Sequence, residues 1–353
     1  MRIGLVAGPW IPVPPRTYGG IERVVDSLAR GFSAAGHEVV LAAPSDSTCP
    51  VRPAPGMRPA SGEDLGYTIS ELSHVVRAYQ GLRGVDIIHD HTLAGPLYLN
   101  RPRQVPVATT IHGPLHPQAV DIYRAMARDS AIIAISRDQA SHAPDVPVSR
   151  VIHHGMDVQA VPVGSGRGGY LCFVGRSCPD KGLPEAIMLA RRAGMPLRIA
   201  VKMRQPDELR YFREVIEPML GPNEDFVGEV DDGGKFALMG EALAFLNPIQ
   251  WSEPFGLVMI EALATGTPVI GTSIGSAPEI VEHGRTGFLG ETENLAEFVP
   301  AAAGLSRELC RRTAEQRFSE ERMVSEHLEL FSELLEGKGP GGVPDAVGVH
   351  QNL

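Results

Sequence analysis

The chain has 353 residues, of which 43% are hydrophobic and 21% charged, and its formal net charge is −10. This length suits two medium-sized domains, and the acidic balance argues against a general surface for nucleic acid or anionic lipid. Residues 1–150 contain 14 basic and 13 acidic residues, a net charge of +1, so the remainder has a net charge of −11. An anionic ligand of that remainder would need specific cations at its site.

Two features bear on the cellular compartment. The four cysteines form no C-x-x-C pair, which favours reduced thiols. The N-terminus lacks the long apolar core and cleavage site of a signal peptide, and no stretch approaches 18 apolar residues. We therefore expect a cytoplasmic protein without a transmembrane segment.

The first half alternates short apolar strands with helices. Gly19 and Gly20 precede a helix that Gly36 ends, and its apolar residues are spaced three and four apart. The strands expected in this half are residues 2–7, 38–43, 85–89, 105–111, 131–135 and 151–153. Near-continuous apolar strands separated by helices predict a parallel sheet covered on both faces.

The same pattern restarts after a Gly-rich break at residues 164–169. Expected strands are residues 170–174, 197–201, 242–245 and 268–270, and expected helices are residues 183–193, 207–217, 255–264 and 278–281. The predicted fold class is α/β with two Rossmann-like domains that face a cleft. The domains expected are residues 1–160 and 161–305, followed by terminal helices packing across both at 306–336 and a flexible tail at 337–353.

The loop NPIQWSEPFG, residues 247–256, follows an apolar strand. Pro254 suits the first turn of a helix, whose N-terminus would bind an anion. Glu253 precedes this helix and Glu261 lies on it, about 10 Å away at roughly 1.5 Å per helical residue, which is too far to share a proton. They suit two contacts to one long ligand. The alternative is an acid favoured by the helix dipole plus a solvated glutamate.

The loop GRSCPDKG, residues 175–182, also follows a strand. Arg176 and Lys181 are two cations in an acidic half of the chain. Fixed cations and a helix N-terminus would stabilise the charge that develops on a departing diphosphate. Two ordinary surface cations are the alternative interpretation.

Two further candidates lie in the first half. Gly19 and Gly20 lack the G-x-G-x-x-G fingerprint, so they indicate either an approach to phosphate or sugar or a simple tight turn. His89 and His91 suggest zinc, but no third ligand has a convincing spacing, and we expect no metal. His112 follows a strand and would hydrogen-bond a sugar hydroxyl or serve as a structural histidine.

Taken together, these loops resemble the retaining glycosyltransferases of family four, which have the GT-B fold. The resemblance covers roughly residues 1–335. Its strongest part is EPFGLVMIEALATGTPVI, which carries the spacing E-x7-E, and FVGRSCPDKG matches the segment that supplies the diphosphate cations. TYGGIERVV, DIIHDHT, TIHG, AISRDQA and HHGMD follow the order that is usual in the family.

The resemblance implies a donor-binding second domain, an acceptor-side first domain and a role for each site residue. Arg176 and Lys181 would hold the diphosphate, Glu261 the ribose hydroxyls and Glu253 the donor sugar. Backbone groups of Phe255, Gly256 and Leu257 would contact sugar and phosphate. His112 would lie by the anomeric carbon, and Gly20, beside Gly19, would close over the phosphate.

The implied reaction is transfer of a hexose-type sugar from a nucleotide-diphosphate sugar, with retained anomeric configuration and no metal or other cofactor. The departing phosphate would take the acceptor proton. A UDP-sugar is our favoured donor, and glycan, lipid-linked sugar and natural-product acceptors stay open, as does the oligomeric state; nucleic acid is not expected as a partner. The alternatives are a nucleotide-sugar epimerase of GT-B architecture and a catalytically inactive sugar-binding homologue. His154 and Ser276 depart from the asparagine and glycine that are common in the family.

Overall fold

The computed structural model describes residues 1–16 and 19–337. Thr17, Tyr18 and all but the first residue of the expected tail at 337–353 lie outside the described residues. The chain divides into two compact units. Among the described residues, unit 1 comprises residues 1–16, 19–135, 140–152 and 323–337, and unit 2 comprises residues 136–139 and 153–322.

Unit 1 contains a sheet of seven parallel strands in the order β3-β2-β1-β4-β5-β6-β7. Its central strands are almost entirely buried, because helices cover both faces of the sheet. The strands are β1 (Arg2–Val6), β2 (Glu38–Ala42), β3 (Arg52–Pro53), β4 (Ile87–Asp90), β5 (Val107–Thr110), β6 (Ala131–Ala134) and β7 (Val148–Val151).

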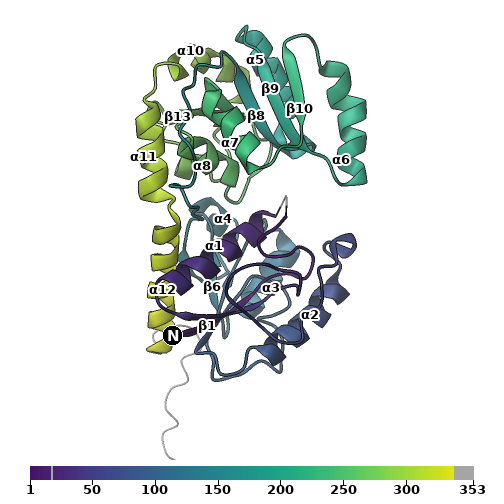
Figure 1. Ribbon diagram of the computed structural model, residues 1–353, viewed down its shortest axis with the longest axis vertical. Helices are drawn as coiled ribbons and strands as arrows, with labels where there is room; N and C mark the ends of the chain where they lie inside the picture. The colour runs from purple at the N-terminus through teal and green to yellow at the C-terminus, as the bar shows by residue number, and fades with distance from the viewer. Residues whose placement is uncertain (17–18, 338–353) are drawn as a thin grey trace, which may run out of the picture. The chain divides into compact units, whose positions relative to one another are not determined.

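Five helices of the described chain contribute to this unit: α1 (Gly20–Ala34), α2 (Thr68–Gly81), α3 (Pro117–Met126), the end of α4 (Arg137–Ser141) and most of α12 (Glu320–Leu335). The last helix packs against the C-terminal end of α1 (Figure 1), and the ring centres of Phe32 and Phe331 are 5.5 Å apart. A Cβ atom on Gly31 would lie 2.3 Å from Val324, so a small residue there lets the two helices meet. The chain's final helix thus completes the core of the unit with which the chain begins.

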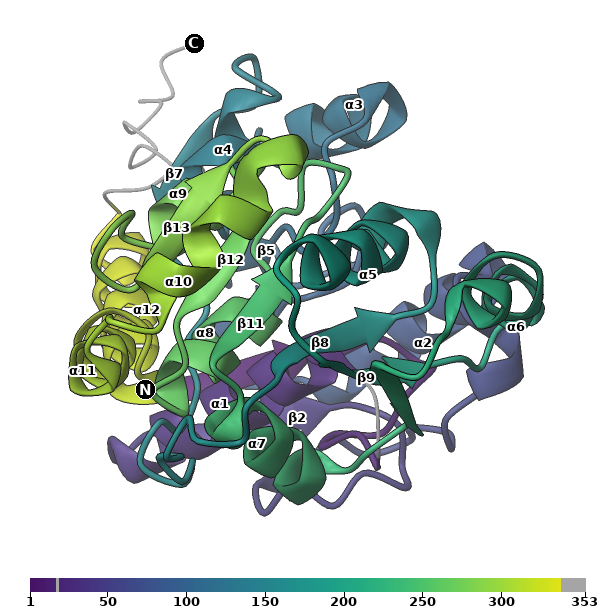
Figure 2. The same cartoon turned by 90° about the horizontal axis from the view of Figure 1, so that it is seen from above.

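Unit 2 contains six parallel strands in the order β10-β9-β8-β11-β12-β13. Figure 2 shows β9, β8, β11, β12 and β13 side by side in that order. The strands are β8 (Leu171–Arg176), β9 (Leu197–Lys202), β10 (Glu224–Gly228), β11 (Ala244–Asn247), β12 (Val269–Thr272) and β13 (Gly287–Gly290). The helices are α5 (Leu183–Arg192), α6 (Pro206–Tyr211), α7 (Asp232–Glu241), α8 (Leu257–Ala264), α9 (Ala277–Ile280), α10 (Val299–Ala302) and α11 (Arg307–Arg317).

The predicted fold is confirmed: two parallel-sheet α/β units, with the final helix returning to the first. Several local predictions were wrong. The strand expected at residues 151–153 ends at Val151, and α2, α7, β3, β10 and β13 had not been predicted. The sequence of β10 is EDFVG, in which exposed residues alternate with more buried ones. It contains no continuous apolar run, so its sequence does not indicate a buried strand.

Candidate active site

The loop of residues 247–256 leads from β11 into α8. The helix begins at Leu257, three residues later than Pro254, so the prediction that Pro254 occupies the first helical turn was wrong. Gly256 caps the helix with φ 84°, a left-handed conformation that glycine adopts without steric cost. The chain can therefore turn sharply at Gly256, and residues 253–256 form an extended loop before the helix.

Glu253 lies at the centre of this loop and is bound from two sides. Its carboxylate pairs with the ammonium group of Lys181, and Trp251 Nε1 donates to it at 3.0 Å. The Lys181 ammonium also lies 5.6 Å from the centre of the Trp251 ring. Both charged side chains are about four-fifths buried. The structure thus brings together two of the predicted residues as a direct ion pair.

The two predicted loops are joined by their backbones. Gln250 N–H donates to the carbonyl of Asp180 at 2.9 Å. Gly182 has φ 71°, and a Cβ atom there would lie 1.9 Å from the carbonyl oxygen of Pro248. Only glycine fits this close approach, because any side chain would collide with a backbone atom. The spacing between Lys181 and Glu253 is therefore set by the main chain.

Arg176 ends β8, and Lys202 lies opposite it in register at the end of β9. Arg176 Nε donates to Glu208 Oε1 at 2.6 Å, and Glu208 also accepts from the N–H groups of Arg204 and Gln205. Burial opposes ionisation of Glu208, but these donors outweigh it and lower its pKa. Burial, together with Arg176 and Arg204, lowers the pKa of Lys202 despite the nearby Glu208. Cationic side chains thus gather at this edge of the sheet.

Glu261 lies on α8 and is not the solvated glutamate of the alternative interpretation. Its side chain is 12% exposed and pairs with Lys235 Nζ at 2.5 Å. Lys235 comes from the first turn of α7, and its ammonium also lies 3.2 Å from Asp232. The second glutamate of the E-x7-E spacing therefore has its own lysine, distinct from the one that binds the first.

Ser276 and His154, the two departures from the family pattern, both contact Phe255. Ser276 is fully buried, and its hydroxyl donates to the Phe255 carbonyl. The His154 ring meets the Phe255 ring edge-on at 5.2 Å. Both residues therefore support the loop that carries Glu253.

In unit 1, the remaining predicted residues are Gly19, Gly20 and His112. A Cβ atom on Gly19 would lie 2.7 Å from both Pro15 and the carboxylate of Glu22, so close packing already requires this glycine. Gly20 begins α1. His112 Nε2 and His91 Nδ1 are 2.8 Å apart, and burial, reinforced by His327, lowers the pKa of His112 to about 3. His112 is therefore neutral near pH 7.

Three histidines of unit 1 lie close together with their rings tilted against one another. Ring centres are 4.2 Å apart for His89 and His91 and 4.9 Å apart for His89 and His327. Within residues 1–16 and 19–337, no group of three or more His, Cys, Asp or Glu side chains is arranged to hold a metal ion. His89 Nε2 bonds instead with the hydroxyl of Thr110 at 2.8 Å.

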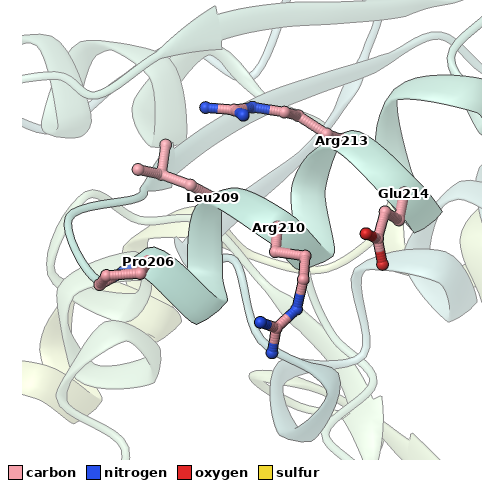
Figure 3. Close-up of a pocket in the computed structure, with 5 residues that line it drawn as sticks. All are labelled: Pro206, Leu209, Arg210, Arg213 and Glu214. Carbon is pink, nitrogen blue, oxygen red and sulfur yellow. The ribbon is translucent and has the colours of Figure 1, made fainter.

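A separate surface hollow of about 410 Å³ lies on α6 and the turn that follows it. It is lined by Pro206, Leu209, Arg210, Arg213 and Glu214 (Figure 3). The figure shows Arg210 and Arg213 on opposite sides of the helix, so the two cations do not converge. None of the predicted site residues lines this hollow, and the strand-end loops remain the candidate site.

Four site residues were not predicted from the sequence: Lys202, Glu208, Lys235 and Trp251. Lys202 gave a usable signal, because a cation directly after an apolar strand matches the position of Arg176. Glu208 and Lys235 are separated from their partners by 32 and 26 residues, respectively. No short motif reports such pairs.

In a comparison with known proteins, each half of the chain matches a glycosyltransferase family model. Residues 18–160 match the model Glycosyltransferase Family 4, and residues 164–318 match Glycosyl transferases group 1. Glycogen synthase of Mycobacterium tuberculosis is 28% identical, with 92% of this chain and 91% of that protein aligned. No helix in the described part of the chain is long and apolar enough to cross a membrane.

Solved structures agree. AviGT4, a glycosyltransferase involved in avilamycin A biosynthesis, is 26% identical with a TM-score of 0.73, covering 95% of this chain and 98% of that one. Sucrose-phosphate synthase from Thermosynechococcus elongatus shares the fold at 19% identity and a TM-score of 0.77, over 95% and 99% of the two chains. With a family 4 first half, a group 1 second half and the GT-B fold, the chain belongs to the glycosyltransferases and is an enzyme that transfers glycosyl groups.

Proposed function

We propose that this enzyme transfers a hexose-type sugar from a nucleoside-diphosphate sugar to a carbohydrate hydroxyl, with retention of anomeric configuration and without a metal. The observation that carries the proposal is the pairing of Lys181 with Glu253 beside Arg176, at the carboxyl edge of the unit 2 sheet. This arrangement combines fixed cations for a diphosphate with a carboxylate for sugar hydroxyls.

In this proposal, Arg176 and Lys181 bind the two phosphates. Without donor, the charge of Lys181 is balanced by Glu253, and the charge of Arg176 by Glu208. A diphosphate adds negative charge next to both cations, so each is placed to stabilise the bond-breaking step, in which the leaving group gains charge. Glu253 then binds the sugar hydroxyls, and Glu261 the ribose.

The N-terminus of α8 supplies the neutral part of the site. The backbone groups of Phe255, Gly256 and Leu257 lie at the start of α8, where the helix dipole favours negative charge. His112 is proposed to hydrogen-bond the transferred sugar as a neutral imidazole, and Gly19 and Gly20 to give a phosphate close access to the backbone. No protein base is assigned, since the leaving phosphate itself takes the proton of the acceptor hydroxyl.

The acceptor class rests on the relatives. One resembles this chain over most of its length and is named a glycogen synthase, and another takes part in the biosynthesis of avilamycin A. We propose a sugar hydroxyl of a glycan or glycosylated natural product as the acceptor, a UDP-sugar as the donor and a cytoplasmic location.

The direct test is thermal melting with UDP, GDP, ADP, dTDP and NAD in turn, in the presence of a chelator. A nucleotide at 100 times its Kd adds about 2.7 kcal/mol of stability. We expect one nucleoside diphosphate to raise the Tm and to identify the base of the donor. If none does so, or if only NAD does, the proposal is wrong.

The proposed transferase and the alternative epimerase differ in their products. The sugar nucleotide of the identified base is incubated with the enzyme, with and without an oligosaccharide acceptor. Release of the nucleoside diphosphate that requires the acceptor supports transfer. A new sugar nucleotide formed without acceptor supports the epimerase, and binding without either product supports the inactive homologue.

A further inference from the structure

Lysine is scarce in this protein. The sequence contains four, Lys181, Lys202, Lys235 and Lys338, and the first three lie in unit 2. Lys181 pairs with Glu253, and Lys202 ends the strand next to Arg176. Lys235 pairs with Glu261, the second glutamate of the site, and neither the sequence motifs nor the proposed chemistry assigns it a role.

The pair formed by Lys235 and Glu261 is almost enclosed, with side-chain exposures of 13% and 12%. Lys235 leans over the ring of Phe236, with 5.0 Å between the ammonium and the ring centre. A buried carboxylate without a counter-charge would be costly, so the lysine offsets the burial of Glu261. Lys235 also holds Oε1 of Glu261 towards α7, because this oxygen accepts a hydrogen bond from the lysine ammonium group.

The balance of charge at this pair differs from that around Arg176. One ammonium lies between two carboxylates, those of Asp232 and Glu261. Carboxylate oxygens accept several hydrogen bonds each, and one cation does not use them all. Such a site attracts hydroxyl donors and repels phosphate, whereas the strand ends at Arg176 and Lys202 attract phosphate.

We infer that Lys235 is a positioning residue for the donor's ribose: it holds the Glu261 carboxylate in the orientation that accepts the ribose hydroxyls. This inference rests on the proposed donor site. It assigns the two lysine–glutamate pairs to different parts of the donor, with Lys181 and Glu253 at the phosphate and sugar, and Lys235 and Glu261 at the nucleoside.

The test is a binding titration with three probes in the presence of a chelator: whichever of UDP, GDP and ADP binds the wild type most tightly, its 2′-deoxy form, and inorganic pyrophosphate. We expect Lys235→Met to lose about tenfold in affinity for the nucleotide, the equivalent of one hydrogen bond to a charged group, and about twofold or less for pyrophosphate. The variant should no longer distinguish the ribo form from the 2′-deoxy form. Lys235→Arg, which keeps the charge, should restore most of the difference.

Arg210→Met is the matched control, because Arg210 is an exposed cation of unit 2 whose ion pair with Asp207 is open to solvent and contributes little. It should bind all three probes as the wild type does. If Lys235→Met is unstable, Lys235→Met combined with Glu261→Gln also removes the buried charge that the lysine balances, and its affinities should match those of Glu261→Gln alone, because the lysine acts through Glu261.

Two results would overturn the inference. One is an unchanged preference of Lys235→Met for the ribo form, and the other is an equal loss of affinity for nucleotide and pyrophosphate, which indicates a general electrostatic role. Failure of the proposed function looks different, since then none of UDP, GDP, ADP and dTDP binds the wild type and the variants have nothing to alter.

Discussion

The two units have the same kind of sheet but different polar groups at the ends of their strands. In unit 1, β4 ends in His89 and Asp90, both fully buried, and burial lowers the pKa of His89 and raises that of Asp90 to about 6. In unit 2, β8 and β9 end in Arg176 and Lys202, next to the buried Glu208. At these strand ends, burial therefore shifts the titratable groups of unit 1 towards their neutral forms, whereas unit 2 keeps its charges by pairing them.

This difference shows that the same sheet architecture can present neutral hydrogen-bonding groups in one unit and paired charges in the other. Burial without a counter-ion suppresses ionisation, so unit 1 can present neutral hydrogen-bonding groups such as His112. Paired ions keep their charge when buried, and the cation of such a pair can bind an anionic ligand in place of its protein carboxylate. The unit with fixed cations is accordingly the one in which we place the diphosphate, although its overall charge is negative.

The largest expected effect comes from removing one of the fixed cations. Lys181→Ala should lower turnover about 10²- to 10³-fold, the cost of losing one preorganised charge in a transition state. The fold should survive, because Trp251 still donates to Glu253. Steady-state kinetics with the identified donor measure the change, and Arg213→Ala, at an exposed cation on the same unit, is the control. Near-normal turnover would show that Lys181 does not act in the reaction, and it would weaken the contrast between the neutral groups of unit 1 and the paired charges of unit 2.

A smaller effect is expected where the carboxylate, rather than the cation, is changed. Glu208→Gln weakens the bond to Arg176 and those from Arg204 and Gln205, which should cost about 2 kcal/mol of stability, as for a hydrogen bond to a charged group. The urea midpoint measures this. The exposed Glu217→Gln should leave the midpoint unchanged, and equal effects of the two variants would show that pairing at Glu208 does not stabilise unit 2.

Unit 1 is probed through pH at Glu22. Burial, partly offset by a backbone hydrogen bond, raises the pKa of this carboxyl to about 7. Because the folded-state pKa lies above the unfolded value of about 4.5, the stabilising contribution is complete below pH 4.5 and is lost as the pH rises through 7. Glu22→Gln should therefore gain Tm relative to the wild type between pH 5 and pH 8.

Melting curves of both proteins across this pH range decide the matter. The exposed Glu63→Gln serves as the control and should show a constant difference from the wild type. A constant difference for Glu22→Gln as well would mean that Glu22 is ionised in the folded protein, contrary to the neutral character of unit 1.

The smallest expected effect tests whether the loop of Glu253 needs its support. Ser276→Ala removes the donor to the Phe255 carbonyl and should cost about 1 kcal/mol, the usual net value of one hydrogen bond. A lower urea midpoint with turnover changed less than in Lys181→Ala would assign Ser276 to the scaffold. A loss of turnover as large as that of Lys181→Ala would instead make the loop's support as important as its charges.

Local sequence patterns determined much about this protein. Apolar runs such as residues 2–7 and 197–201 predicted buried parallel strands, because such strands have no polar face. The cations of residues 175–182 and the spacing of Glu253 and Glu261 identified the edge of the sheet that carries the candidate site. These features are readable because each is contained within a few consecutive residues.

Only the tertiary structure decided how those residues are held. Arg176 meets Glu208 from α6, Glu261 meets Lys235 from α7, and Gly182 fits against Pro248. The late start of α8 likewise follows from the left-handed turn at Gly256, which overrides the preference of Pro254 for a first helical turn. These contacts join residues far apart in the chain, and their geometry depends on the packing of whole elements, which no local pattern encodes.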